Sequence, residues 1–195
     1  MKNLFKNSAI IGAGLMSCLF LSFDSFAQTN TKKDAKEVNE DKFKNTKDAD
    51  LLVEAYSSGM MEIRVAENVK GRTVSPELKE LANRLEAEHN DLNNQILELA
   101  EKMSITLPAQ LTEGQLKDVD NIAKKSGMDL DKAYIDMLVA SHKKLEMLFE
   151  KGAKCEDSEI SALFAAGLPR IKEHLEMAMN IKNSQKEDLD KSGMN

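Results

Sequence analysis

The chain of 195 residues holds only three histidines, and each of them interrupts a row of apolar residues. His89 stands in the leucine row of LEAEHNDLNNQI, where the spacing of three and four residues leads one to expect another apolar side chain. His142 and His174 take the same place in two later rows, and Glu62 does so in an earlier one. The spacing therefore predicts four titratable groups, one on each of four amphipathic segments, that face the same interior.

Buried imidazole and carboxyl groups need partners, because an unpaired polar group in a protein interior costs about 1–3 kcal/mol. A metal ion would satisfy several of them at once, since imidazole nitrogen and carboxylate oxygen suit zinc, iron, manganese or copper. Glu86 stands three residues before His89 and adds a Glu-x-x-His pair. The alternative is a hydrogen-bonded network of the same groups with water and without metal. The predicted metal ligands are Glu62, Glu86, His89, His142 and His174.

Four long helices must position these residues. Ser75 and Pro76 offer an N-cap and a first helical residue for the second helix, and Pro169 predicts a kink in the fourth. A short helix should open at Thr112 in the connection of residues 104–127, where Gln115 completes a capping box. The predicted fold class is all-α, a ferritin-like four-helix bundle with a long crossover that carries a short extra helix, and a plain up-down bundle is the alternative. The apolar spacing predicts the four helices over about 48–70, 75–103, 129–154 and 157–184.

The bundle is expected to span residues 47–184, with both chain ends outside it. Residues 1–27 carry two lysines, an apolar run and Ser25-Phe26-Ala27, which is typical of a secretory signal peptide cut after Ala27. The apolar run of about 15 residues is short for a membrane span, so no stable span is expected after cleavage. An uncleaved anchor and a lipid on Cys18 are the alternatives. Two polar segments are expected to be disordered, a tether at residues 28–46 and a tail at 185–195.

Charge and cysteine content exclude several classes of function. The formal net charge of -6 makes nucleic acid an unexpected partner. Cys155 is the one cysteine beyond the predicted cut, so an internal disulfide is excluded and a free bystander thiol is expected. The sequence shows no glycine-rich phosphate loop and no hydrolytic triad. The eleven methionines indicate core packing, with copper handling as the alternative.

Four segments of the chain resemble an exported bacterial family, the proteins of domain of unknown function 4142 (DUF4142), which are grouped with ferritin-like folds. These segments are DADLLVEAYSSGMMEIRVAEN, LANRLEAEHNDLNNQILELAEKMSITLP, DKAYIDMLVASHKKLEMLFEK and LFAAGLPRIKEHLEMA, and the resemblance covers about residues 48–182. It implies a periplasmic or envelope helical bundle and brings no established activity. The family pattern includes the positions that match Glu62, His89, His142, Leu168, Pro169 and His174.

The ferritin-like grouping suggests a di-iron site, but that chemistry needs a Glu-x-x-His pair on each of two helices. Ile171 stands where His174 would require the glutamate, so a mononuclear, histidine-rich site is the better expectation. The predicted function is an exported bundle that binds a transition metal and protects the envelope under stress. A metal-free structural or protein-interaction bundle is the alternative, and the sequence identifies no protein partner.

Overall fold

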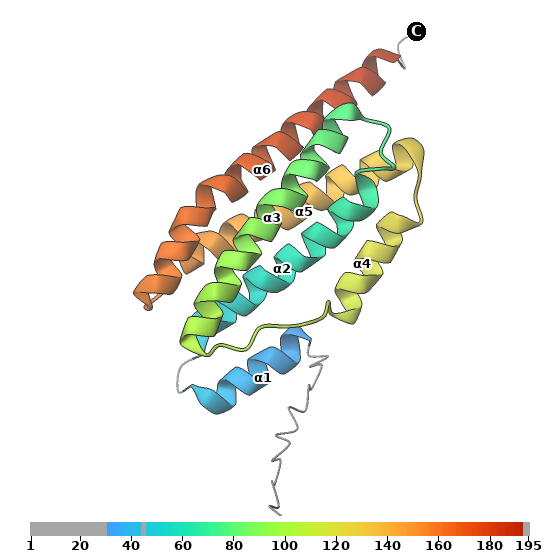
Figure 1. Ribbon diagram of the computed structural model, residues 1–195. Coiled ribbons are helices and arrows are strands. Elements are labelled where there is room, and N and C mark those ends of the chain that lie inside the picture. Colours follow the sequence, from blue (N-terminus) through green and yellow to red (C-terminus); the bar gives the residue numbers. More distant parts are fainter. Residues whose placement is uncertain (1–30, 44–45, 193–195) are drawn as a thin grey trace, which may run out of the picture.

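The computed structural model describes residues 31–43 and 46–192, so the predicted signal peptide, its cut after Ala27 and Cys18 lie outside the described residues. All regular elements in the described part are helices, which confirms the predicted all-α class (Figure 1). They are α1 (Lys32–Lys42), α2 (Lys47–Val69), α3 (Pro76–Met103), α4 (Glu113–Ala123), α5 (Gly127–Gly152) and α6 (Ser158–Ser192).

Helices α2, α3, α5 and α6 form a four-helix bundle. Two antiparallel hairpins, α2 with α3 and α5 with α6, pack together through α2 against α5 and α3 against α6. Helices α3 and α5 run in the same direction, so the chain must travel back along the whole bundle between them (Figure 1). Helix α4 lies on this crossover and packs against α2 and α5. The predicted bundle with a crossover that carries a short extra helix is therefore confirmed.

Local signals set the helix ends where the sequence predicts them. The Ser75 hydroxyl accepts a hydrogen bond from the Leu78 amide at 3.2 Å, and Pro76 is the first residue of α3. Thr112 and Gln115 form the predicted capping box at the start of α4. The fourth bundle helix departs from expectation, because α6 continues to Ser192 instead of ending near residue 184. Once a long helix is nucleated, adding each further residue costs little, so polar helix formers extend it.

Helix α1 shows that the predicted disorder of residues 28–46 is wrong over Lys32–Lys42. Asn39 is fully buried, and its side-chain amide donates to the Thr106 carbonyl at 3.0 Å. The Asn39 side-chain oxygen accepts from the Thr106 amide at 2.8 Å. The Asn39 side chain therefore pairs with both the carbonyl and the amide of Thr106, which lies in the crossover. Such a contact between distant segments holds the helix although its apolar content is low.

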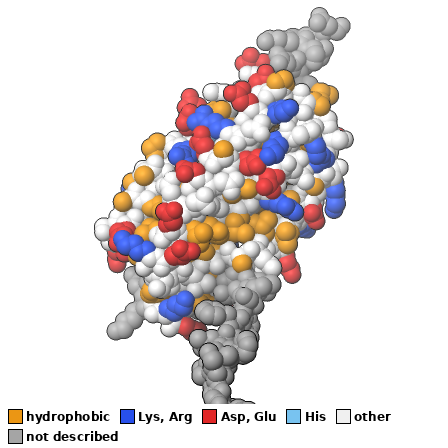
Figure 2. Space-filling model, in the orientation of Figure 1, with side chains coloured by type: hydrophobic (Ala, Val, Ile, Leu, Met, Phe, Trp, Pro, Cys, Tyr) orange, Lys and Arg blue, Asp and Glu red, His pale blue; other side chains and the backbone are white. Residues whose placement is uncertain are grey.

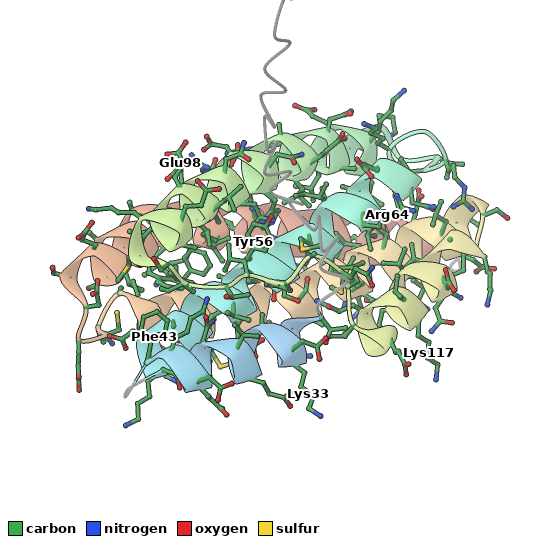
Figure 3. All side chains as sticks on the ribbon, turned by 60° about the horizontal axis from the view of Figure 1, so that its bottom comes forward. Lys33, Phe43, Tyr56, Arg64, Glu98 and Lys117 are labelled. Atoms are coloured by element: carbon green, nitrogen blue, oxygen red, sulfur yellow. The ribbon has the colours of Figure 1, made fainter. Side chains whose placement is uncertain are left out.

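Ion pairs hold the opposite end of α1. Lys32 and Lys36 each lie 2.7 Å from a carboxylate oxygen of Glu54 on α2. Figure 3 shows Lys33 on the outer side of the same helix, pointing away from the bundle. Phe43, directly after α1, packs against the bundle core. Helix α1 is therefore a surface helix fastened at both ends to α2 and the crossover.

Charged side chains of both signs are spread over the outer surface. Acidic and basic side chains are interspersed on the face shown in Figure 2, and an apolar band crosses its lower half. A mixture of both signs is typical of a solvated surface. Among the helices in residues 31–43 and 46–192, none is both long enough and apolar enough to cross a bilayer.

Replacing Asn39 by alanine should detach α1 from the crossover, because it removes both hydrogen bonds to Thr106. A loss of about 1–3 kcal/mol is expected, which corresponds to roughly fivefold to hundredfold faster hydrogen exchange of the α1 amides. Exchange followed by NMR measures this directly. Glu40→Ala, at an exposed position of the same helix, is the matched control and should leave exchange unchanged. Equal protection in Asn39→Ala would contradict the proposed anchor.

Candidate metal centre

A single polar layer crosses the middle of the bundle interior. Each bundle helix contributes one residue to it, and all four side chains are buried, with 1% exposure or less. An apolar cluster lies on each side of this layer, so that Leu85 and Leu92 on α3 belong to different clusters. The structure thus brings the four groups of the sequence prediction to one level. They are Glu62 from α2, His89 from α3, His142 from α5 and His174 from α6.

The three imidazole rings of this layer form a nearly equilateral triangle. Their centroids lie 5.5 Å apart for His89 and His142, and 5.4 Å apart for each pair that includes His174. One nitrogen from each ring lies within 4.8 Å of the nitrogens of the other two. The His89 and His142 Nε2 atoms are 3.4 Å apart. Two nitrogens bound tetrahedrally to one zinc ion are also about 3.4 Å apart, so this spacing suits a shared metal.

Two of the three rings are oriented by a hydrogen bond on the nitrogen that points away from the triangle. His142 Nδ1 donates to the Leu138 carbonyl at 3.1 Å, and His174 Nε2 donates to a Glu88 carboxylate oxygen at 2.8 Å. These bonds assign the lone pairs to His142 Nε2 and His174 Nδ1, and the latter is buried without a hydrogen-bond partner. An acceptor on the outer nitrogen is the usual second layer around histidines that bind metal.

Burial holds His89 and His174 in the neutral form that metal binding requires. Burial, followed by the neighbouring His142 and His174, keeps the pKa of His89 well below its ordinary value. Burial lowers the pKa of His174 to about 4, against the opposing effect of the Glu88 carboxylate. At neutral pH both rings therefore offer a lone pair instead of a positive charge.

Glu88, which the sequence analysis missed, replaces Glu86 as the acidic neighbour of the triangle. In an α-helix, Glu86 and Glu88 lie on opposite sides of the direction in which His89 points, because successive residues are 100° apart. Glu86 pairs with Lys70 at 2.5 Å and does not belong to the histidine cluster. The only available signal for Glu88 was its spacing of four residues from Arg84, whose Nε atom lies 2.7 Å away.

Charge stabilises Glu88 as a carboxylate. Burial raises the pKa of Glu88, but hydrogen bonds from Arg84 and His174 outweigh it and hold that pKa below the usual range. Arg170 on α6 adds a further positive charge, with its Nε atom 3.5 Å from Glu88 Oε2, the oxygen that also accepts from His174. The acceptor behind His174 is thus ionised and fixed in place.

Glu62 lies behind His142 and not within the nitrogen triangle. One of its carboxyl oxygens is 3.8 Å from His142 Nδ1, and both oxygens are buried without a hydrogen-bond partner. Burial raises the pKa of Glu62, with His142 and then the Ser141 hydroxyl acting against it. The buried Tyr134 hydroxyl also has no hydrogen-bond partner, and burial followed by Glu62 raises its pKa well above the usual value. Glu62 therefore belongs to the polar layer as an outer neighbour of one predicted ligand.

Cys155 lies apart from this layer, in the turn between α5 and α6. It is free and half-buried, and its thiol donates to the Asp157 carbonyl at 3.4 Å. Burial raises the pKa of the Cys155 thiol, with Asp48 acting in the same direction. A thiol in this environment is poorly nucleophilic, as the sequence-based expectation of a bystander requires.

The metal-free protein should lose stability as the pH falls from about 7 to about 4. Unfolded histidine takes up a proton near its ordinary pKa of 6.5, whereas burial holds the pKa of His174 at about 4 and that of His89 below its ordinary value. The unfolded state therefore binds more protons in this window, and the free energy of unfolding declines. For His174 alone the loss approaches about 3 kcal/mol.

Urea unfolding at several pH values, with a chelator present, measures this effect. Glu62 acts in the opposite direction, because its raised pKa lets the folded state keep a proton, so the comparison is cleanest in a Glu62→Gln background. Adding His174→Gln to that background should flatten the pH dependence. Equal slopes with and without His174 would show that this imidazole is not held neutral in the folded state.

Comparison with known proteins gives one match. No curated protein and no solved structure matches the chain. One family model, described as "Domain of unknown function (DUF4142)", matches residues 32–181, a range that begins at the first residue of α1 and includes the whole polar layer. The chain therefore belongs to the DUF4142 family.

Proposed function

We propose that the protein is an exported envelope protein that binds one transition-metal ion through His89, His142 and His174. The observation that carries this proposal is the triangle of buried imidazoles, in which two outer nitrogens are held by oxygen acceptors. Three protein ligands leave a fourth position on the ion for water or another small ligand. Export is supported by the lysines, apolar run and small residues of the first 27 residues.

The ligand set favours a single zinc, copper or iron ion over manganese. Imidazole nitrogen suits the first three, whereas manganese prefers carboxylate and water oxygen. Within the described residues, no carboxylate joins the three nitrogens in the cluster, so the bridging ligands of a ferritin-type di-iron site are missing there. The site thus supports binding of one ion, with sequestration of envelope metal as the protective role.

A metal-free network explains the same residues less well. His89 Nε2 can donate to the lone pair of His142 Nε2 across 3.4 Å, which would join two of the rings. His174 Nδ1 is then still buried without a partner, at a cost of about 1–3 kcal/mol. An ion in the triangle would bind that nitrogen together with the other two.

Chelator-treated protein should bind one Zn²⁺ per chain at neutral pH. Isothermal calorimetry gives the stoichiometry and affinity, and visible absorption of the Co²⁺ form reports the coordination. His142→Ala should weaken binding about a hundredfold or more, because two imidazoles hold zinc poorly. His89→Asn, which preserves more of the core volume, should do the same, and circular dichroism checks that both variants fold. Folded wild-type protein that takes up neither Zn²⁺, Cu²⁺ nor Fe²⁺ would refute the proposed function.

The acceptor behind His174 offers a matched pair of variants on one helix. Glu88→Gln removes the charge that orients His174, so zinc affinity should fall about tenfold to a hundredfold. Glu86→Gln lies two residues away and pairs with Lys70, so it should leave affinity unchanged. Competition with a coloured chelator measures both. Equal affinities in the two variants would show that Glu88 does not support the ion.

A further inference from the structure

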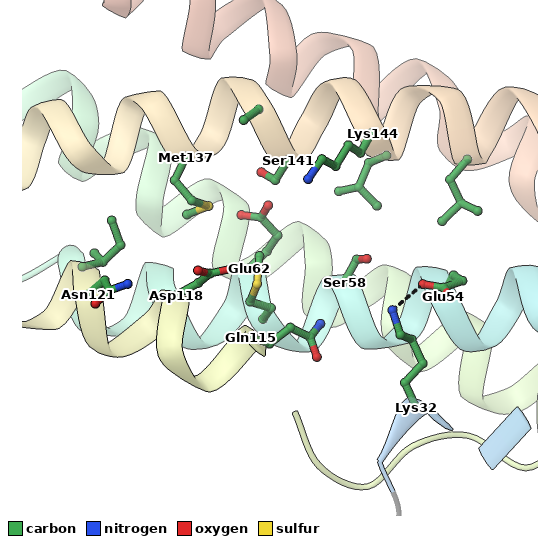
Figure 4. A pocket seen from close by; sticks show the side chains of 15 residues that line it. Lys32, Glu54, Ser58, Glu62, Gln115, Asp118, Asn121, Met137, Ser141 and Lys144 are labelled. Atoms are coloured by element: carbon green, nitrogen blue, oxygen red, sulfur yellow. Dashed lines mark hydrogen bonds and ion pairs between the residues drawn. The ribbon is translucent and has the colours of Figure 1, made fainter. Parts of the chain in front are cut away.

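A cleft with a volume of about 640 Å³ opens between α2, α4 and α5, and Glu62 is among the residues that line it (Figure 4). Figure 4 shows the Glu62 carboxyl group rising from α2 toward Ser141 on α5. The cleft thus reaches the polar layer from a side that does not involve His174 or Glu88. Its volume falls within the range of about 300–1,000 Å³ typical of small-molecule sites.

The cleft is elongated along the bundle. On α2 its lining extends from Glu54 to Glu62, which is about 12 Å at the helical rise, and on α5 it extends from Met137 to Leu148, about 16 Å. The two helices run antiparallel here, with Glu62 opposite Met137 and Ser141, and with Glu54 and Lys32 at the other end (Figure 4). The cleft therefore suits an elongated ligand.

The walls are largely apolar, while Glu62 supplies an acid without a counterion in its immediate contacts. Leu145 and Leu148 line the half of the cleft toward Glu54, and Ile122 of α4 lines it as well. Neither carboxyl oxygen of Glu62 makes a well-formed hydrogen bond, and the one hydroxyl among the described residues that lies close enough to lower the pKa of Glu62 is that of Ser141. Lys32 at the far end is already paired with Glu54 at 2.7 Å. A hydrogen-bond donor that enters from outside would therefore satisfy a buried acid that the described residues leave unpaired.

We propose that this cleft binds an elongated organic cation, of the alkylammonium class, with its ammonium group on Glu62 and its apolar body along Leu145 and Leu148. An ammonium group carries several donors and a full charge, so it pairs with both carboxyl oxygens and offsets the cost of burying them. The apolar body removes the walls from water and contributes the remaining affinity. This binding needs no metal ion and is separate from the proposed ion site.

Charge separates this ligand class from its closest alternative. A fatty-acid anion of the same length would place its carboxylate either against Glu62 or beside Lys144, which Figure 4 shows next to Ser141 on α5. The first arrangement brings two acids together, and the second leaves Glu62 buried against an alkyl chain without a partner. Both arrangements cost free energy that the ammonium ligand avoids.

Titration of chelator-treated full-length protein with octylammonium, octan-1-ol and octanoate tests the proposal, because these probes share a chain and differ in the head group. Amide shifts in NMR spectra give the affinity and show whether α2 and α5 line the site. Octylammonium should bind at least tenfold more tightly than octan-1-ol. Absence of octylammonium binding, or tighter binding of octanoate, would overturn the proposal.

Variants then separate the head group from the apolar body. Glu62→Gln should reduce octylammonium affinity to within about twofold of octan-1-ol, whereas Asp118→Asn, an exposed acid at the rim, should leave it unchanged. Leu148→Ala should weaken both probes equally, because it removes apolar wall and no charge. Thermal unfolding confirms that each variant is folded. Octylammonium affinity that is the same in Glu62→Gln and wild-type protein would overturn the role of Glu62.

Discussion

The interior of this bundle depends on one constraint, which is that four polar groups must be kept at a single level between two apolar clusters. Each cluster on its own would be an ordinary hydrophobic core, held by leucine, isoleucine and phenylalanine side chains. The layer between them contributes little hydrophobic free energy and carries a desolvation cost instead. A fold that tolerates this cost on four helices at once must hold those groups in close register, and the antiparallel hairpins provide that register.

Most of the fold follows from local patterns, since amphipathic spacing, caps and turn residues lie close together in the sequence. Helix α1 escaped prediction because its anchor, Asn39, pairs with a residue 67 positions away, and composition alone carries no record of such a partner. A different reason explains the length of α6, where weak local preference extends an already packed helix. A prediction of disorder from composition fails most easily for a polar segment in which one side chain is buried and hydrogen-bonded to a distant residue.

The buried residues of the site could be predicted from the sequence, but the contacts between them could not. Histidines that interrupt apolar rows were found from spacing, because burial of a row is a property of one helix. The carboxylate behind His174 was not found, because Glu86 and Glu88 are distinguished only by which neighbouring helix each one faces. Glu62 was found as a member of the layer, but its place behind His142 depends on the packing of α2 against α5. Sequence spacing thus identifies which residues are buried, and tertiary packing determines which of them are in contact.

The imidazole of His142 lies between the other two histidines and the cleft that Glu62 lines. Its Nε2 atom faces the other histidines, while its Nδ1 side faces the Leu138 carbonyl and the Glu62 carboxyl that lines the cleft. An imidazole ring is flat, rigid and polarisable, so a change of charge near Nδ1 alters the electron density of the lone pair on Nε2. A charge that enters the cleft is therefore electrostatically coupled to the histidine triangle through a single ring, without any molecule passing between them.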